Sequence, residues 1–308
     1  MKDIREPVYL EDKLKEIEAS GKLDYRSQAI PTWCPGCGYF SIVEGVSKAM
    51  TELGLDQKDT VCVSGIGCAS RFPFFMNTYG FHSLHGRALP VATGIKVAND
   101  KLNVIVVGGD GDAFAIGGAH IPHAARRNIG ITYIVFDNGV YGLTKGQTSP
   151  TSVLGFRTTT TPYLNMDEPL NPLMMLLSYG ASWVAQAYAG KPHHLTEMIR
   201  QAIAHRGFSY LHVLSPCVTF DKTSMTYQNL NLAVRPLPET HDTSDLAAAM
   251  AAAQDTKALQ LGVYYATERP TLSDGLNDIA QRARWDDSRA RCRAVSQACL
   301  AGTACSRR

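Results

Sequence analysis

Residues Asn103 to Asn138 read NVIVVGGDGDAFAIGGAHIPHAARRNIGITYIVFDN, and their pattern of apolar and polar residues predicts the architecture of the chain. Two short apolar runs, Val104–Val107 and Ile131–Phe136, have the length and β-branched content of buried parallel strands. The segment between them is long enough for one right-handed crossover helix, which would return the chain to the same sheet edge. The pattern therefore predicts an α/β fold, with a parallel sheet flanked by helices.

A polar residue follows each of these two runs. Asp110 comes after the first run and Asn138 after the second, so both should lie at the carboxyl ends of strands. Open α/β sheets bind their ligands at that edge. A carboxylate, an amide oxygen and glycine-rich backbone suit a hard divalent cation that holds a phosphate group. The sequence therefore predicts a cation and phosphate site there.

The run GDGDAF at residues 109–114 must also be compared with the dinucleotide fingerprint G-x-G-x-x-G. Phe114 stands where the third glycine belongs, and Asp110 would repel a pyrophosphate unless a cation lay between them. We therefore reject a Rossmann dinucleotide site. A divalent ion with thiamine diphosphate fits this stretch better.

Composition limits the class of protein. The chain has 308 residues, of which 45% are hydrophobic, enough for one large α/β domain or two smaller ones. Its formal net charge of +2 is too small to indicate nucleic acid, and residues 281–308 alone hold seven Arg and two Asp. No run approaches the ~18 apolar residues of a membrane span, and the charged N-terminus does not resemble a secretory signal. We expect a cytoplasmic protein that binds neither nucleic acid nor membrane.

The rest of the chain continues the alternation of strands and helices. Further strands are expected at Thr60–Ser64, Ser182–Ala187 and Ser209–Leu214, an edge strand at Leu261–Ala266, and helices at 10–17, 41–53, 88–99, 170–179, 193–205 and 247–254. Residues 149–169, rich in Thr and Pro, should form a long ordered loop or lid. We expect an arm at 1–24, a main domain at 25–235 and a C-terminal extension at 236–308, atypical from about residue 281.

The eight Cys indicate metal ligands or buried thiols before disulfides. Cys34 and Cys37 form a C-x-x-C pair, which by itself fits a redox pair or half of a zinc ribbon. Cys68 and Cys217 follow predicted strands, whereas Cys62 lies inside one and should be a core thiol. The combined spacing of the pair with Cys68 and Cys217 fits an iron–sulfur cluster better than zinc. A cluster beside a cation–phosphate site implies electron transfer from a compound bound through its diphosphate.

Taken together, these motifs resemble the β subunit of the 2-oxoacid:ferredoxin oxidoreductases, closest to the 2-oxoglutarate (KorB-type) branch. The matching motifs lie within residues 25–225 and are WCPGCG, SGIGCASR, HGRALPVATGIK, VVGGDGD, IGGAHIPHAARRN, DNGVYGLTKGQTSPT and SPC. The spacing from Asp110 to Asn138 (138 − 110 = 28) agrees with the thiamine diphosphate signature of this family. The resemblance implies the diphosphate-binding domain fold of thiamine enzymes.

The resemblance also implies roles for individual residues. It implies a Mg²⁺ site made by Asp110, Asn138 and the backbone carbonyl of Val140, and one 4Fe–4S cluster held by Cys34, Cys37, Cys68 and Cys217. Lys145 matches a family position implicated in binding coenzyme A or substrate. The thiamine diphosphate pocket would be lined by Ile66, Gly67, Cys68, Ala69, His85, Gly86, Arg87, Ala88, Gly109, Gly111, Asp112, Gly142 and Leu143.

The implied activity is oxidative decarboxylation of a 2-oxoacid, with 2-oxoglutarate first, to acyl-CoA and CO₂, or the reverse reductive carboxylation. Ferredoxin would accept the electrons. An α subunit would supply the glutamate that activates the thiamine ring, so the chain should be inactive alone and work as a dimer of αβ heterodimers. The alternative substrate reading is a pyruvate or broad-range enzyme.

Two other classes of protein are weighed against this reading. The first is a non-oxidative or acetolactate-type thiamine enzyme, or an indolepyruvate relative; the four placed cysteines argue against the non-oxidative kind, which would need no electron acceptor. An iron–sulfur electron-transfer subunit without thiamine would not need the pattern from Asp110 to Asn138. The tail cysteines at 292, 299 and 305 match no metal site.

Overall fold

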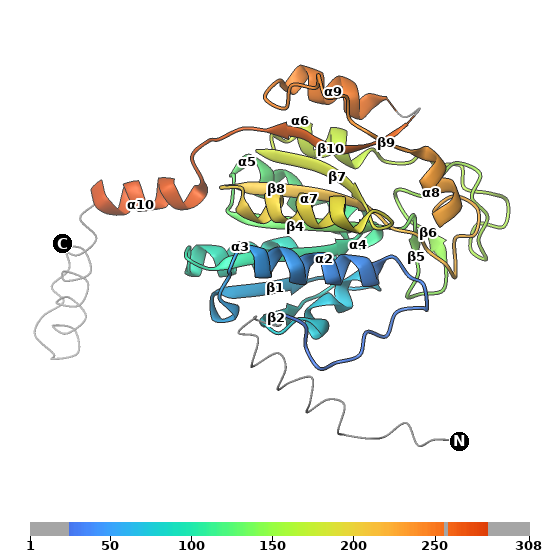
Figure 1. Ribbon diagram of the computed structural model, residues 1–308, viewed down its shortest axis with the longest axis horizontal. Coiled ribbons are helices and arrows are strands. Elements are labelled where there is room, and N and C mark those ends of the chain that lie inside the picture. The colour runs from blue at the N-terminus through green and yellow to red at the C-terminus, as the bar shows by residue number, and fades with distance from the viewer. Residues whose placement is uncertain (1–24, 256–257, 283–308) are drawn as a thin grey trace, which may run out of the picture.

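The computed structural model describes residues 25–255 and 258–282. Within them, eight strands form one sheet in the order β2-β1-β3-β4-β8-β7-β10-β9 (Figure 1). The strands are β1 (Thr60–Ser64), β2 (Tyr79–His82), β3 (Asn103–Gly109), β4 (Ile131–Asp137), β7 (Trp183–Tyr188), β8 (Phe208–Leu214), β9 (Val234–Pro236) and β10 (Leu259–Ala266), with a separate hairpin of β5 (Val140–Tyr141) and β6 (Gln147–Thr148). The α/β fold with a largely parallel sheet is thus confirmed.

Helices cover both faces of this sheet. In Figure 1, α2 (Tyr39–Glu52) and α7 (Pro192–Ala204) lie in front of the strands. The opposite face is covered by α3 (Ala88–Ala98), α5 (Ile121–Arg126), α6 (Pro172–Ser178) and α9 (Leu246–Gln254). Within β3, Ile105 and Val107 pack toward the first pair of helices, whereas Val104 and Val106 pack toward the others. Because successive side chains of a strand alternate between faces, a strand covered on both faces reads as a continuous apolar run.

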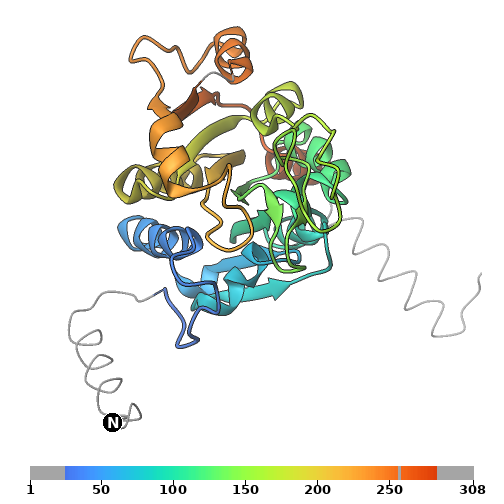
Figure 2. The same ribbon diagram turned by 90° about the vertical axis from the view of Figure 1, so that its right-hand side faces the viewer.

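The remaining elements are short or peripheral. They are α4 (Asp110–Phe114), α8 (Tyr227–Ala233), α10 (Leu272–Arg282) and the 3₁₀ turns η1 (Gln57–Asp59), η2 (Ala69–Phe75) and η3 (Gly118–His120). Figure 2, turned by 90°, shows the two helical layers on either side of the strands. Among the described residues, no helix combines the length and the hydropathy needed to cross a bilayer. The predicted helix at 10–17 and the tail cysteines lie outside the described residues.

Two expectations about secondary structure were wrong. The crossover between β3 and β4 is not one helix but three short pieces: α4, η3 and α5. The breaks follow from the residues: Gly117 and Gly118 are poor helix formers, and Pro122 is placed where a new helix begins. A Cβ on Gly117 would lie 2.4 Å from the carbonyl oxygen of Asp112, so only glycine fits there.

The expected edge strand near the C-terminus also differs. Its residues form β10, which lies inside the sheet, antiparallel to β7 and parallel to β9. β9 covers the outer side of β10 and has only three residues, too few to produce a readable pattern. The carboxyl-terminal part of the described chain therefore extends the same sheet.

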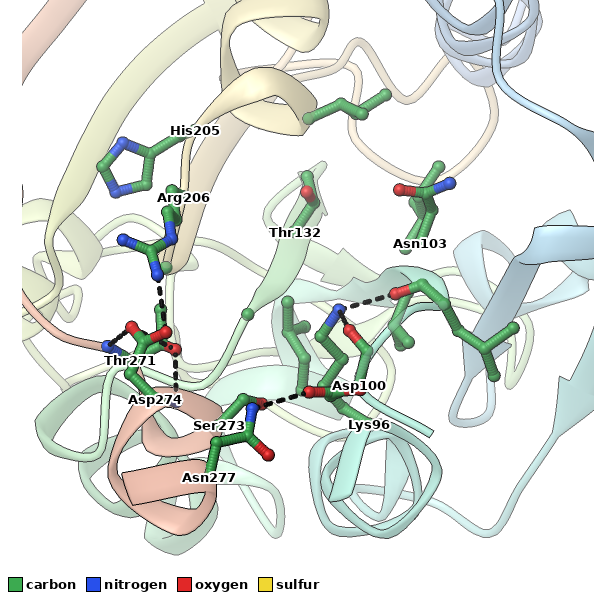
Figure 3. Close-up of a pocket in the computed structure, with 17 residues that line it drawn as sticks. Lys96, Asp100, Asn103, Thr132, His205, Arg206, Thr271, Ser273, Asp274 and Asn277 are labelled. Atoms are coloured by element: carbon green, nitrogen blue, oxygen red, sulfur yellow. Dashed lines mark hydrogen bonds and ion pairs between the residues drawn. The ribbon is translucent and has the colours of Figure 1, made fainter. Parts of the chain in front are cut away.

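A polar cavity of about 260 Å³ lies at the amino-terminal ends of the central strands (Figure 3). Its cationic side chains already have partners. Lys96 donates to the carbonyl oxygens of Asp100 and Leu102, at 2.8 and 2.6 Å, and Arg206 pairs with Asp274 at 2.5 Å. These contacts fasten α3 and α10 to neighbouring segments, and the cavity lies at the sheet edge opposite the predicted site.

Candidate functional site

The loops at the carboxyl ends of β1, β3 and β4 enclose a cavity of about 500 Å³. In Figure 1 this is the end of the sheet where β5, β6 and α8 gather. Most residues predicted to contact the cofactor line this cavity: Ile66, Gly67, Cys68, Ala69, His85, Gly109, Gly111, Asp112, Gly142 and Leu143, together with Asp110, Asn138 and Val140. The fold thus gathers segments that lie far apart in the sequence around one space.

Asp110, Asn138 and Val140, which we call the cation corner, form one wall of this cavity. Asp110 opens α4 directly after β3 and is 2% exposed, and Asn138 follows β4. Burial and the neighbouring carboxylate of Asp137 raise the pKa of Asp110 to about 8. Two neighbouring buried carboxylates repel each other, and a divalent cation would relieve that repulsion. The oxygen donors of the corner fit Mg²⁺.

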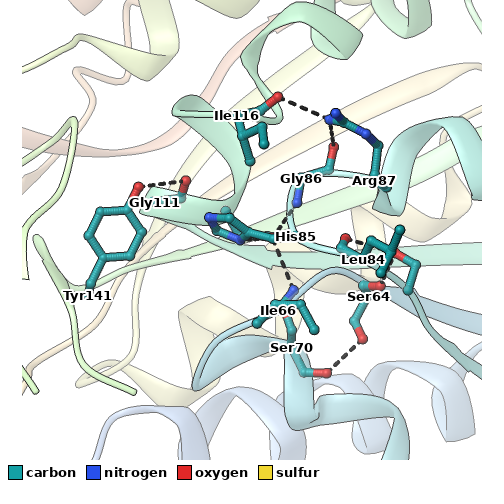
Figure 4. A network of polar contacts seen from close by, with 12 residues as sticks. Ser64, Ile66, Ser70, Leu84, His85, Gly86, Arg87, Gly111, Ile116 and Tyr141 are labelled. Carbon is teal, nitrogen blue, oxygen red and sulfur yellow. Dashed lines mark hydrogen bonds and ion pairs between the residues drawn. The ribbon is translucent and has the colours of Figure 1, made fainter. Parts of the chain in front are cut away.

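Asp112 joins the two loops on the opposite side of the cavity. Its carboxylate accepts hydrogen bonds from the backbone N–H of Ile66 at 3.0 Å and of Gly86 at 2.7 Å, and its Oδ1 lies 2.8 Å from Nδ1 of His85. Figure 4 shows His85 between these two backbone groups, with Tyr141 beyond it. Asp112 is 3% exposed, and burial raises its pKa against the lowering effect of these donors. Asp112 therefore fixes, from a buried position, the loop that carries Ile66 and the loop that carries His85 and Gly86.

Tyr141 makes a glycine necessary at position 111. Its hydroxyl donates to the carbonyl oxygen of Gly111 at 3.2 Å, and a Cβ on that glycine would lie 2.1 Å from Cε1 of the ring. The backbone of Gly111 can therefore approach a ligand with no side chain between them. This geometry suits a diphosphate seated above the start of α4.

The three segments that carry the four predicted cluster ligands are connected by hydrogen bonds. Trp33 Nε1 donates to the carbonyl oxygen of Cys68 at 2.7 Å, which joins the C-x-x-C segment to the loop after β1. The backbone N–H of Gly38 donates to the carbonyl oxygen of Pro216 at 3.5 Å. The hydroxyl of Tyr227 donates to the carbonyl oxygen of Gly36 at 3.1 Å. These contacts bring the C-x-x-C segment beside the loop that follows β8.

The thiols of Cys37 and Cys68 feel the charges of the other cysteines in the set. Burial raises the pKa of Cys37 to about 12, and Cys217, Cys68 and Cys34 add to the rise. Burial, with Cys217 and Cys34, raises the pKa of Cys68 to about 11. Among the described residues, however, no three His, Cys, Asp or Glu side chains are arranged to hold a metal ion. The structure brings the cysteine loops together, and the cluster stays a prediction.

Several predicted residues lie outside the lining of the cavity. Gly86 donates to Asp112, and Ala88 begins α3. The guanidinium of Arg87 donates to the carbonyl oxygens of Gly86 and Ile116, as Figure 4 shows. Lys145 lies in the turn of the β5–β6 hairpin, exposed and with φ of 76°. The ligand contacts of these four residues stay predictions.

The structure also adds residues that the sequence did not reveal. Tyr39, Tyr141, Thr144 and Gln147 line the same cavity. Tyr39 and Tyr141 look like ordinary core or loop aromatics in the sequence. Thr144 and Gln147 reach the cavity on the β5–β6 hairpin, whose strands have only two residues each, too few to produce a sequence pattern.

Two consecutive parts of the described chain match known families. Residues 65–213 match the family described as thiamine pyrophosphate enzyme, C-terminal TPP binding domain. Residues 217–281 match the family described as the C-terminal part of the pyruvate ferredoxin oxidoreductase beta subunit. The boundary between the two matches falls at Cys217.

Curated relatives carry consistent names. The chain is 47% identical over 201 residues to 2-oxoglutarate oxidoreductase subunit KorB of Mycobacterium tuberculosis, covering 65% of this chain and 54% of the relative. It is 50% identical over 191 residues to the 2-oxoacid:ferredoxin oxidoreductase subunit beta of Saccharolobus solfataricus, covering 61% and 63%. It is 42% identical over 201 residues to 2-oxoglutarate synthase subunit KorB of Archaeoglobus fulgidus, covering 65% and 75%. The matched region thus spans less than two thirds of several relatives.

A solved structure agrees with these relatives in both sequence and fold. It is the 2-oxoglutarate:ferredoxin oxidoreductase from Magnetococcus marinus with 2-oxoglutarate, coenzyme A and succinyl-CoA bound. The two chains are 50% identical and superimpose with a TM-score of 0.83, covering 84% of this chain and 89% of the other. This chain therefore belongs to the β subunit family of the 2-oxoacid:ferredoxin oxidoreductases.

Proposed function

We propose that the chain is the β subunit of an enzyme that oxidatively decarboxylates a 2-oxoacid to acyl-CoA and CO₂, with ferredoxin as electron acceptor. One observation carries this proposal: the cation corner and the loops of the four cysteines meet at the same end of the sheet. Cys68 takes part in both, because it lines the cavity and its pKa responds to two other cysteines of the set. Decarboxylation and electron removal thus have adjoining sites.

The chain's own residues would hold the cofactors. Asp110, Asn138 and the carbonyl oxygen of Val140 would bind Mg²⁺ and, through it, the diphosphate of thiamine diphosphate. The loop at 66–69 and the backbone of Gly111 would surround the diphosphate, positioned by Asp112. When bound, thiamine diphosphate supplies an electron sink for decarboxylation, and the cluster supplies a one-electron carrier.

We propose 2-oxoglutarate as the substrate. The supporting observations are the names of the KorB relatives and the 2-oxoglutarate and coenzyme A bound in the Magnetococcus marinus structure. The general 2-oxoacid name of the Saccharolobus solfataricus relative keeps a pyruvate or broad-range enzyme as the second candidate. Comparing kcat/KM for 2-oxoglutarate and pyruvate in the purified complex decides between them: equal values, or a preference for pyruvate, would overturn our assignment.

Replacing Lys145 by Ala should raise the KM for 2-oxoglutarate about 10- to 100-fold, since a hydrogen bond to a charged group contributes about 1.5–3 kcal/mol. The reason is that an exposed cation on a hairpin beside the cavity can reach the second carboxylate of 2-oxoglutarate, which pyruvate lacks. The measurement is steady-state reduction of ferredoxin with each 2-oxoacid and with varied coenzyme A. Lys101→Ala, an exposed lysine near the opposite sheet edge, is the control. Unchanged KM values for both acids and coenzyme A would refute the role.

We further propose that activity requires an α subunit, which would supply the glutamate that activates the thiamine ring. Apart from the β5–β6 hairpin, the strands of the described residues form one sheet, and residues 65–213 match a single thiamine diphosphate-binding domain. The chain purified alone should therefore show no turnover of 2-oxoglutarate, and adding the α subunit should restore it. Native mass spectrometry of the active complex should give the mass of a dimer of αβ heterodimers. Turnover by the single chain would contradict the prediction.

The decisive experiment for the function as a whole is analysis of the complex purified without oxygen. Thiamine diphosphate, Mg²⁺, and iron with acid-labile sulfide should be present, and ferredoxin should be reduced only with a 2-oxoacid and coenzyme A. Iron without thiamine would favour the electron-transfer subunit, and thiamine without iron would favour a non-oxidative enzyme. We place the complex in the cytoplasm, in keeping with the lack of disulfides among the described cysteines.

A further inference from the structure

A line of buried side chains crosses the sheet beneath the cation corner. Gln186 of β7 and His212 of β8 are directly paired in the strand register, and Asp137 closes β4 beside them. His212 Nδ1 lies 2.8 Å from Oε1 of Gln186, and His212 Nε2 lies 2.8 Å from Oδ2 of Asp137. All three residues are 4% exposed. We call these residues, with Thr151, the polar line.

The directions of the hydrogen bonds between Gln186 and His212 follow from the contact that Gln186 makes with Gln260. The amide Nε2 of Gln186 lies 2.8 Å from the carbonyl oxygen of Gln260, which can only accept. Oε1 of Gln186 must then face His212, so Nδ1 of His212 must donate. Nδ1 of His212 therefore points to Gln186, and its Nε2 is left to hydrogen-bond Oδ2 of Asp137.

Asp137 connects this pair to all three members of the cation corner. Its Oδ1 accepts from the backbone N–H of Gly139 at 2.9 Å, which fixes the turn that carries Asn138 and Val140. The same oxygen accepts from the hydroxyl of Thr151 at 2.8 Å, and that hydroxyl lies 3.2 Å from Oδ2 of Asp110. The Thr151 hydroxyl thus lies between the carboxylates of Asp137 and Asp110, so the position of the first bears on the position of the second.

We propose that His212, oriented by Gln186, is the positioning residue of the cation site: through Asp137 it sets the turn 138–140 and, through Thr151, the carboxylate of Asp110. It acts without touching cation or cofactor, in the way that outer partners orient metal ligands. The inference rests on the proposed function only in taking the corner as the Mg²⁺ and thiamine diphosphate site.

The test is the Mg²⁺ dependence of thiamine diphosphate binding, measured by calorimetry on the complex after removal of both ligands. His212→Phe keeps a planar ring but removes both ring nitrogens, and with them the contacts to Gln186 and Asp137. It should raise the Mg²⁺ concentration for half-maximal binding by about 10- to 100-fold, the usual effect of losing an outer partner. His212→Gln can place an N–H toward Asp137 and should recover most of that loss.

A second pair of variants serves if His212→Phe does not fold. Thr151→Val removes the shared hydroxyl at constant shape and should shift the Mg²⁺ dependence in the same direction, whereas Thr151→Ser should restore it. The matched control is Tyr210→Phe. The Tyr210 ring stacks on the His212 ring, with 6.3 Å between the ring centroids, and the buried Tyr210 hydroxyl makes no hydrogen bond within the described residues. This control should leave the dependence unchanged.

The outcomes separate this inference from the proposed function. If the unaltered complex binds no thiamine diphosphate with Mg²⁺, the proposed function fails. If it binds but His212→Phe, or Thr151→Val in its place, keeps the same Mg²⁺ dependence, the positioning role is refuted. Equal losses in His212→Phe and His212→Gln would also refute it, because they would indicate packing rather than hydrogen bonding to Asp137.

Discussion

Replacing Asp110 by Asn should abolish turnover and raise the Mg²⁺ concentration needed for thiamine diphosphate binding by more than ~100-fold. This loss is larger than the one expected from a residue that only orients the metal ligands without touching the cation. Asn keeps the shape of the side chain but removes the negative charge that a divalent cation would meet. Burial already disfavours that charge, as the rise of the Asp110 pKa to about 8 indicates, so the ion and the carboxylate stabilise each other. Calorimetry at several Mg²⁺ concentrations, with a ferredoxin-reduction assay, measures both effects.

The control for this substitution is Asp59→Asn. Asp59 is exposed and lies at the amino-terminal end of β1, at the opposite edge of the sheet from the cation corner. The Asp59→Asn substitution should leave cofactor binding and turnover unchanged. If the Asp110 variant bound thiamine diphosphate with the same Mg²⁺ dependence as the unaltered complex, the cation corner would be wrongly assigned.

Replacing Cys217 by Ser should remove the cluster and reduce electron transfer to ferredoxin to background. A hydroxyl is a much poorer ligand than a thiolate for iron in such a cluster. Cys217 does not line the 500 Å³ cavity, so thiamine diphosphate should still bind, with an affinity lowered only as far as loss of the cluster loosens the loop at 66–69. Iron and sulfide content, visible absorbance and thiamine diphosphate binding should be measured on the same preparation.

Cys62 provides a matched comparison. It is also a buried cysteine, but it lies within β1, and its sulfur accepts a hydrogen bond from the Thr78 hydroxyl at 3.4 Å. Cys62→Ala should retain iron and activity. Full iron content in the Cys217 variant, or equal iron loss in both variants, would argue against Cys217 as a ligand.

The fold was largely predictable because its central strands are buried on both faces. Val104–Val107 and Ile131–Phe136 leave no doubt about their type, since continuous β-branched runs of that length suit buried strands. The interrupted crossover was missed because its small apolar residues agree with a helix except at Gly117 and Gly118. β2 was missed because Tyr79–His82 is a run of only four residues, all of them exposed.

The site was predictable where residues follow the ends of strands, since parallel topology alone brings Asp110 and Asn138 to one edge. The polar line was not. Gln186, His212 and Asp137 lie far apart in the sequence, and their contacts depend on the register of β4, β8 and β7. His212 in the sequence is a single histidine within a strand, which carries no chemical signal until its neighbours are known.

The double position of Cys68 has a consequence for how the holoenzyme is assembled. Cys68 borders the cofactor cavity, and its carbonyl oxygen accepts a hydrogen bond from Trp33 Nε1. Its thiol is one of the four predicted cluster ligands. Insertion of the cluster would fix the loop at 66–69, and that loop also lines the cavity. Iron loading and thiamine diphosphate loading should then be thermodynamically linked, each increasing the affinity for the other by the same factor.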